Sequence, residues 1–244
     1  MDRRGSLRRQ YLEAMGIQVW ERRPQPNPTS NHTSPVSQEP ALETALHEST
    51  DMFPAGDGDV AAMDWNELET TVCECVRCPL HKGRTQAVFG VGSRQAQWMF
   101  VGEAPGVEED RQGEPFVGRA GQLLNAILLA LGLKREDVYI ANVLKCRPPK
   151  NRDPQIEEVD RCEPFLVRQI ELIRPQIIVA LGRHAAHSLL KTELPLSKLR
   201  GQRLSYHGIP LIVTYHTAYL LRNPVDKRKV WDDLCLARSV VGEA

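Results

Sequence analysis

The stretch of sequence that decides the fold runs from Trp98 to Gly132 and reads WMFVGEAPGVEEDRQGEPFVGRAGQLLNAILLALG. It begins with a short apolar run, residues 98–101, which is typical of a buried strand. It ends with a helical apolar pattern, residues 122–131, that stops at a glycine. Between the two lies a loop of glycines, prolines and acidic residues. A strand, a long loop and a helix in this order predict one unit of a parallel sheet.

The same alternation of strands and helices continues along the chain. Three further strands are expected: 138–143, 177–181 and 211–214. Four further helices are expected: 65–78, 156–173, 183–190 and 225–241. Asp64 is suited to cap the first of these helices. Strands that alternate with helices predict an α/β fold, a three-layer α/β/α sandwich with a central four-stranded parallel sheet.

Length and composition restrict the class of protein. The chain has 244 residues, of which 41% are hydrophobic and 25% charged, as in ordinary globular proteins. It contains no apolar run of about 18 residues and no apolar signal segment, so we expect a cytoplasmic protein with no membrane partner. The six cysteines of such a protein more often bind metal or do redox chemistry than form disulfides.

Charge and composition divide the chain into three parts. Residues 1–23 are basic and have apolar side chains at roughly helical spacing, which predicts a short amphipathic segment that docks on the domain or on a partner. Residues 24–62 contain no Lys or Arg and are rich in Pro, Ser and Thr, which predicts a flexible acidic linker. Residues 63–244 form the globular domain. Its surplus of basic side chains can attract polyanions such as nucleic acid.

Chemically versatile residues follow three of the expected strands. Glu103 and Glu109 lie in the loop after the first strand, Asn142 lies at the end of the second, and His216 follows the fourth. The carboxyl ends of parallel strands meet at one edge of the sheet, where such sheets bind their ligands. Acids, an amide and a histidine at this edge predict a catalytic site, with the carboxylates as general-base or electrostatic candidates.

Four cysteines form a second group of candidate ligands. Cys75 and Cys78 are expected on one helical turn, whereas Cys146 and Cys162 must be brought to them by folding. Four thiolates suit either a tetrahedral zinc ion or an iron–sulfur cluster, and their spacing leaves both open. The other two cysteines are expected to be spare: Cys73 and Cys235.

In these motifs the chain resembles the type-4 uracil-DNA glycosylases, bacterial and archaeal base-excision repair enzymes that carry a [4Fe–4S] cluster. The resemblance spans roughly residues 70–244 and rests on four segments: GEAPG at 102–106, GEPFVGRAGQLLN at 113–125, YIANVLKCRPPKNRDP at 139–154 and HTAYLLRNP at 216–224. It implies a hydrolase that releases uracil from single- or double-stranded DNA and leaves an abasic site. It also favours the cluster over zinc, with these ligands: Cys75, Cys78, Cys146 and Cys162.

The resemblance assigns a role to each matching position. The implied catalytic residues, which activate water and face O2 of the base, are Glu103, Glu109 and His216. The implied substrate-binding residues, which surround the extruded uracil, are Ala104, Phe116, Asn142 and Asn151. The implied DNA contacts, with a leucine as the apolar wedge, are Tyr219, Leu220 and Arg222. Three further cations are candidates for phosphate contacts: Arg147, Lys150 and Arg152.

Thr217 departs from the family pattern, since most members have proline at this position. This departure keeps a second hypothesis open, a non-catalytic iron–sulfur relative that binds nucleic acid or a polymerase. A third hypothesis is a cluster-bearing electron-transfer protein. As an enzyme the protein is expected to act as a monomer, with a repair or replication protein as the candidate partner of residues 1–23.

Overall fold

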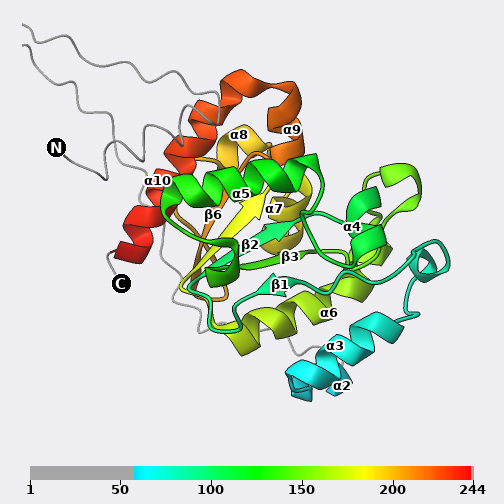
Figure 1. The fold of residues 1–244 in the computed structure, drawn as a ribbon. Coiled ribbons are helices and arrows are strands. Elements are labelled where there is room, and N and C mark those ends of the chain that lie inside the picture. Colours follow the sequence, from blue (N-terminus) through cyan, green and yellow to red (C-terminus); the bar gives the residue numbers. More distant parts are fainter. Residues whose placement is uncertain (1–57, 243–244) are drawn as a thin grey trace, which may run out of the picture.

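The computed structural model describes residues 58–242, and the expected segment 1–23 and most of the expected linker lie outside that range. The described chain folds as a sheet between two layers of helices (Figure 1). The sheet has six strands in the order β1-β3-β2-β4-β6-β5. Their bounds are Val91–Gly92 (β1), Trp98–Gly102 (β2), Tyr139–Asn142 (β3), Ile177–Leu181 (β4), Leu204–Tyr206 (β5) and Ile209–Thr214 (β6).

The four central strands, β3, β2, β4 and β6, are parallel, which confirms the predicted sheet. The structure adds β1 and β5, which pair antiparallel with β3 and β6 at the two edges. These edge strands have two and three residues, too few to show a period in the sequence. Every residue of β2, β3 and β4 is buried, because helices cover both faces of the sheet.

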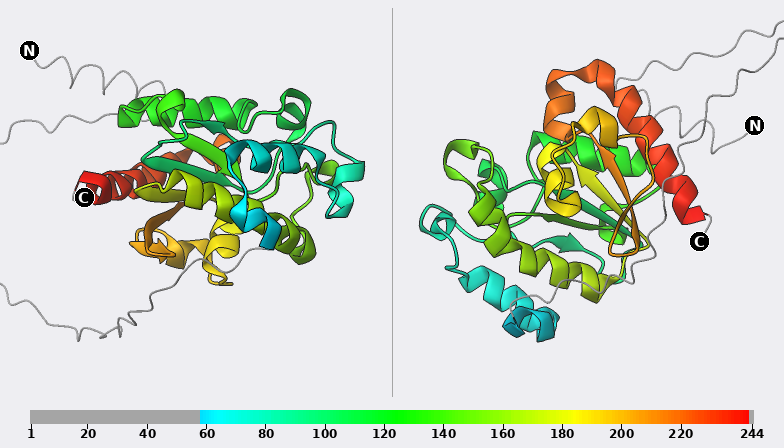
Figure 2. Two further views of the ribbon diagram at one scale, coloured as in Figure 1. Left: turned by 90° about the horizontal axis from the view of Figure 1, so that it is seen from below. Right: turned by 180° about the vertical axis from the view of Figure 1, so that it is seen from behind.

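The main helices lie on opposite faces of the sheet. One apolar core joins α5 and α10 to the sheet, and a second core joins α6 and α7 to the other face (Figure 2). The helix bounds are Gly58–Ala62 (α2), Trp65–Glu74 (α3), Val107–Gln112 (α4), Arg119–Leu131 (α5), Ile156–Ile173 (α6), Arg183–Leu190 (α7), Leu196–Leu199 (α8), Thr217–Arg222 (α9) and Lys227–Gly242 (α10). The predicted bounds of α6 and α7 are confirmed.

Two local predictions about the first helices were wrong. The expected helix 65–78 begins as predicted, with the Asp64 carboxylate accepting from the Asn66 and Glu67 amides at 2.8 and 2.9 Å, but it ends at Glu74. Cys75 and Cys78 therefore lie in extended backbone and not on one helical turn. Residues 58–62, expected as the end of the linker, form α2, which packs on α6 and buries Val60.

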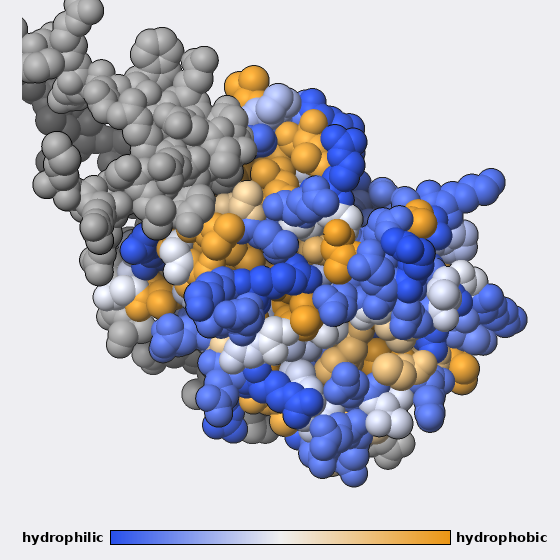
Figure 3. Space-filling view, in the orientation of Figure 1, coloured by the Kyte–Doolittle hydropathy of each residue, from blue (hydrophilic) through white to orange (hydrophobic). Residues whose placement is uncertain are grey.

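The register of the sheet brings the loops after its parallel strands together. Gly102 at the end of β2 pairs with Asn142 at the end of β3, and Leu181 of β4 pairs with Thr214 of β6. The loops that begin at these four residues consequently leave the sheet at the same edge. On the face shown in Figure 3, hydrophobic side chains form several separate groups among hydrophilic ones. None of the helices between residues 58 and 242 has the length and apolar character to cross a membrane.

Candidate functional site

A cavity of about 450 Å³ opens at this edge of the sheet. This volume lies within the range of sites that bind small organic groups. All seven residues predicted for catalysis and substrate binding line it, and no lysine of residues 58–242 does. The lining residues are Glu103, Ala104, Pro105, Gly106, Glu109, Phe116, Ala120, Asn142, Pro148, Asn151, Arg152, His216, Ala218, Tyr219 and Arg222.

Asn142 forms the floor of the cavity and has an unsatisfied oxygen. Its side chain is buried, and Oδ1 has no hydrogen-bond partner within the described residues. Such a buried acceptor costs about 1–3 kcal/mol unless a partner is supplied. Gly102 permits this arrangement, because a Cβ there would lie 2.4 Å from Asn142 Oδ1 and 2.6 Å from the Phe116 ring. The site therefore holds an amide ready to bond to a ligand.

Phe116 covers the same cavity from a strained backbone position. Its φ is 54°, in the left-handed region that phenylalanine rarely adopts, and its side chain is buried. Its ring lies 5.5 Å from the His216 ring, at an interplanar angle of 33°. Strain of this kind persists only where the surrounding structure fixes the backbone. The loop thus places the Phe116 ring close to the Asn142 side chain, since both lie next to Gly102.

Hydrogen bonds to Glu109 fix the backbone of this loop. One oxygen of its carboxylate accepts from the Val117 and Gly118 amides, each at 3.0 Å, and the other accepts from the Gly106 amide at 3.2 Å. Three amide donors occupy both oxygens of the carboxylate and hold it in one position. Glu109 lines the cavity as expected, but its geometry is that of a tie between the two halves of the loop.

Glu103 has a different environment in the same loop. Its side chain is 30% exposed, and no hydrogen bond within the described residues holds its carboxylate. Burial, with the Asp153 carboxylate nearby, raises the pKa of Glu103 to about 7, although the Arg183 guanidinium opposes the rise. A carboxylate with a pKa near neutrality is suited to accept a proton from water.

His216 is the N-cap of α9 and presents a defined tautomer to the cavity. Its Nδ1 accepts from the Ala218 amide at 3.1 Å, so the proton of the neutral ring lies on Nε2. Burial lowers the pKa of His216 to about 4, against the opposing charge of Glu109. The imidazole is consequently neutral at physiological pH and offers one N–H donor. Gly182 lies directly behind it, where a Cβ would come within 2.9 Å of His216 Cβ.

The arginines near the cavity differ in whether they already pair with another side chain of the protein. Arg152 donates to both oxygens of Glu158, at 2.9 and 2.5 Å, and Arg147 donates to Asn151 Oδ1 at 2.8 Å. Arg222 is exposed at the rim of the cavity. Arg222 is therefore better placed than the two paired arginines to contact a phosphate.

The prediction that Leu220 is an exposed wedge was wrong. The helical spacing of α9 turns Leu220 inward, where it is fully buried in the core formed with α5 and α10. The next residue, Leu221, is 41% exposed. Tyr219 lines the cavity and donates from its hydroxyl to Asp226 at 2.7 Å. The neighbouring Thr217 is buried, and its hydroxyl has no hydrogen-bond partner within residues 58–242.

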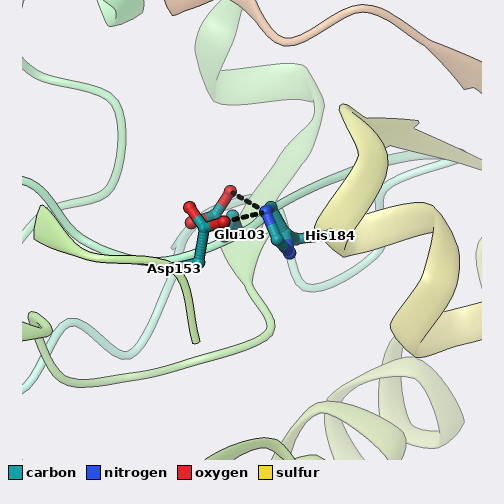
Figure 4. A group of neighbouring side chains, drawn as sticks. All are labelled: Glu103, Asp153 and His184. Carbon is teal, nitrogen blue, oxygen red and sulfur yellow. Dashed lines mark ion pairs between the residues drawn. The ribbon is translucent and has the colours of Figure 1, made fainter. Parts of the chain in front are cut away.

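Sequence reasoning missed the loop that follows the third parallel strand. It contributes Arg183 and His184 from the first turn of α7, and His184 Nε2 lies 3.3 Å from Asp153 Oδ2 and 3.9 Å from Glu103 Oε2 (Figure 4). The signal was present, because Gly182-Arg183-His184 follows an apolar strand just as the other site loops do. Asp153 lies in the segment 139–154 that carries the family resemblance, but the sequence assigned it no role in the site.

The four predicted cysteine ligands meet beside α3 and α6, apart from the cavity. Cys146 and Cys162 are buried in one core cluster, and Cys75 and Cys78 pack against it. Burial raises the pKa of Cys162 to about 12. Between residues 58 and 242, no three cysteine sulfurs lie within 4.8 Å of one another. In a tetrahedral zinc site, with Zn–S bonds of about 2.3 Å, the sulfurs lie about 3.8 Å apart.

Backbone and side-chain N–H groups point at this thiol cluster. Arg84 donates to Cys146 Sγ at 2.9 Å, and the Lys145 amide donates to Cys162 Sγ at 3.3 Å. Such donors are typical partners of metal-bound thiolates. The two spare cysteines do not join the four: Cys73 is exposed on α3, and Cys235 lies on α10.

Comparison with known proteins agrees with this geometry. A family model described as the uracil DNA glycosylase superfamily matches residues 89–235. The chain belongs to this superfamily. A type-4 uracil-DNA glycosylase of Archaeoglobus fulgidus is 48% identical over 65% of this chain and 84% of its own length. One of Thermotoga maritima is 47% identical over 70% of this chain and 91% of its own length.

More distant members of the superfamily also match. A type-5 uracil-DNA glycosylase of Pyrobaculum aerophilum is 35% identical over 64% of this chain and 83% of its own length. The higher identity to the type-4 proteins confirms the family resemblance inferred from the sequence. The uracil-DNA glycosylase fold also agrees with the α/β architecture described above.

Proposed function

We propose that this protein is a monofunctional uracil-DNA glycosylase that hydrolyses the N-glycosidic bond of deoxyuridine in DNA and leaves an abasic site. The observation that carries the proposal is the buried, unpaired Oδ1 of Asn142 on the floor of a cavity roofed by an aromatic ring. The closely similar type-4 proteins support the reaction.

Asn142 reads the base. Uracil presents O4 as an acceptor and N3–H as a donor, and a side-chain amide offers the complementary pair. Oδ1 accepts from N3–H, which satisfies the acceptor that is otherwise buried without a partner. Cytosine reverses both groups and leaves buried polar atoms unpaired, at a cost of about 1–3 kcal/mol for each. Phe116 stacks on the base and excludes water from these bonds.

His216 stabilises the departing base. Cleavage of the glycosidic bond places negative charge on uracil O2 and positive charge on the sugar. The neutral ring, fixed by the Ala218 amide, aims Nε2–H at the oxygen that becomes charged. A donor of this kind in a dry site lowers the barrier by about 2.7–4 kcal/mol. The low pKa of the ring keeps it a neutral donor rather than an acid.

Glu103 acts on the sugar side. Its carboxylate takes a proton from the water that attacks C1′ and favours the positive charge that develops on the sugar. Ala104 leaves the neighbouring wall of the cavity small, and Glu109 holds the loop in this geometry. Asn151 completes the wall from the opposite loop. The electrons of the cleaved bond leave on uracil, and the water oxygen remains on C1′.

Among residues 58–242 no lysine lines the cavity, and this supports hydrolysis without strand cleavage. A lyase forms a Schiff base between an amine and the sugar. Lys145 is buried, and its Nζ donates to Asn142 O at 3.0 Å and to Gln169 Oε1 at 2.6 Å. Lys145 thus bonds to the backbone of Asn142, and it is not among the residues that line the cavity.

The four cysteines fit a [4Fe–4S] cluster better than a zinc ion. No three of their sulfurs lie within 4.8 Å of one another in the described part of the chain, whereas a tetrahedral zinc ion brings its sulfurs about 3.8 Å apart, and N–H donors face two of the four. When bound, the cluster supplies folding free energy near the Asn142 loop. Reduced thiols of this kind suit the cytoplasm. Purified protein should be brown and contain iron, and colourless protein with one zinc per chain would contradict this assignment.

The decisive assay of function is a gel with an oligonucleotide that contains one uracil. Protein followed by alkali should cut the strand at the uracil, whereas protein without alkali should leave it whole. A non-catalytic relative or an electron-transfer protein would leave the strand intact in both lanes. Asn142→Asp should lower the ratio of the uracil rate to the cytosine rate, and an unchanged ratio would show that another group reads the base.

A further inference from the structure

His184 belongs to the cluster of titratable groups beside the cavity. Its Nε2 faces the Glu103 carboxylate at 3.9 Å and the Asp153 carboxylate at 3.3 Å, and Figure 4 shows both carboxylates turned toward the ring. The side chains of Glu103 and His184 are 30% and 27% exposed, whereas that of Asp153 is 70% exposed. The three groups thus form a path from the cavity wall to solvent.

The same three side chains are ligand types for a divalent cation, but a guanidinium already supplies the positive charge. Arg183 places one nitrogen 3.4 Å from Asp153 Oδ2 and 3.1 Å from His184 Nε2. A metal ion at this point would lie against that cation and be repelled. The cluster is therefore better explained by proton chemistry than by metal binding.

We propose that His184 is a positioning residue that orients the Glu103 carboxylate and sets the pH range in which Glu103 accepts a proton. The inference rests on the proposed role of Glu103 in excision. Glu103 has no hydrogen bond within the described residues, and the His184 ring lies within ion-pair distance of its carboxylate. The ring comes from the first turn of α7, a rigid element packed on the sheet.

The ring has two states with different effects on Glu103. With a proton on Nε2 it directs an N–H toward Asp153 Oδ2 at 3.3 Å and Glu103 Oε2 at 3.9 Å, and as an imidazolium it stabilises the Glu103 anion. Without that proton Nε2 accepts from Arg183. Burial lowers the pKa of His184, and Asp153 opposes this fall. The imidazolium consequently forms below neutral pH, where Glu103 would otherwise be protonated.

Other charged groups face this cluster. His187 lies one turn along α7, and His216 faces it from the far wall of the cavity. Glu109 and Arg222 act on His216 in turn. Because His216 remains neutral above a pH of about 4, it adds no charge in the range where Glu103 titrates. We therefore assign the pH dependence of the excision rate to Glu103 and His184, together with their charged neighbours Asp153 and Arg183.

The test is the single-turnover excision rate of the full chain on a single-stranded uracil oligonucleotide, measured across pH 5.5 to 9. His184→Leu removes the cation that forms in acid. The acidic limb of the pH–rate curve, where the rate falls as Glu103 is protonated, should then move to higher pH by roughly half to one unit. The rate at pH 6 should then fall roughly three- to tenfold, since one unit is a tenfold change in ionisation, while the rate at pH 8.5 changes little. His184→Lys supplies a permanent cation and should move the limb to lower pH.

Two controls separate the possible outcomes. His187→Leu alters the same helix but keeps the ring that faces Glu103, so it should shift the limb far less than His184→Leu does. Glu103→Gln should abolish most excision at every pH. Opposite shifts in the two His184 variants support the proposal, because a packing defect lowers the rate at all pH values and moves no limb.

Three results would overturn the proposal. A uniform loss of rate, or an unchanged limb, in both His184 variants would show that His184 does not act on Glu103, even with Glu103→Gln inactive. Shifts of the same sign in both variants would exclude the charge effect. Wild-type excision by Glu103→Gln would remove the proposed role of Glu103 and this inference with it.

Discussion

Glu103 and Glu109 lie in the same loop but have opposite environments. Three backbone amides occupy the carboxylate of Glu109, whereas that of Glu103 lies beside titratable and charged side chains of two other segments, the loop after β3 and the first turn of α7. Burial raises the pKa of Glu103 to about 7. Identical side chains in one loop thus differ in environment: Glu109 accepts from three loop amides, whereas no hydrogen bond between residues 58 and 242 holds the Glu103 carboxylate.

Glu103→Gln tests the reactive half of this comparison. It keeps the shape of the side chain but removes its capacity to accept a proton, so the excision rate should fall by about 10²–10⁴. The melting temperature should not fall, because the neutral amide avoids the cost of a half-buried charge. The matched control is Glu114→Gln, an exposed glutamate of the same loop, which should keep wild-type activity. Equal rates for both variants would contradict the assignment.

His216→Ala removes the neutral donor on the other side of the substrate. We expect the excision rate to fall by about 10²–10³, the usual cost of one oxyanion donor. Binding of uracil-containing DNA, measured by fluorescence anisotropy, should weaken far less than the rate. A loss confined to binding would show that His216 holds the DNA and not the departing base.

Glu109→Ala tests the structural half of the comparison. The change leaves three loop amides without their acceptor, so the free energy of unfolding should fall by about 2–4 kcal/mol after partial replacement by water. Denaturant unfolding of the full chain measures this loss. Glu108→Ala is the control, since that carboxylate is exposed and pairs with the exposed Arg111. If Glu109→Ala is as stable as the control, the loop does not depend on this tie.

The pH dependence of the wild-type rate should show a single acidic limb controlled by Glu103. Glu103 must be ionised to accept a proton, and its pKa is about 7, so the rate should rise with pH and level off above that value. Below it the rate should fall about tenfold for each unit. The pKa of His216, about 4, places its protonation below this limb. A rate that stays constant from pH 5 to pH 8 would contradict the role of Glu103.

Several elements could be predicted because local physics fixes them. Continuous apolar runs marked the four parallel strands, and the helical period marked α6 and α7 with their bounds. The residues that follow the strands and were expected to form a site all line the cavity: Glu103, Glu109, Asn142 and His216. In a parallel sheet the carboxyl ends of the strands lie at one edge, so the loops that follow the strands meet there.

Other features depended on contacts between distant segments. Leu220 had the residue type of a wedge, but the packing of α9 on α5 turns it inward and leaves Leu221 exposed. The Cys75–Cys78 pair left the expected helix because α3 ends at Glu74. Asp153 carries no local pattern, and His184 has only its position after an apolar strand, since both become relevant where the loops after β2, β3 and β4 meet.

The sequence by itself determined the layered α/β fold, the edge that holds the site and the types of residue that line it, because these follow from periodicity and chain order. Only the tertiary structure decided which glutamate is fixed and which is free, and which leucine is buried. It also decided that a histidine from a fourth loop faces Glu103. These properties depend on burial and on hydrogen-bond partners from remote segments, and neither is encoded in the residue's neighbours along the chain.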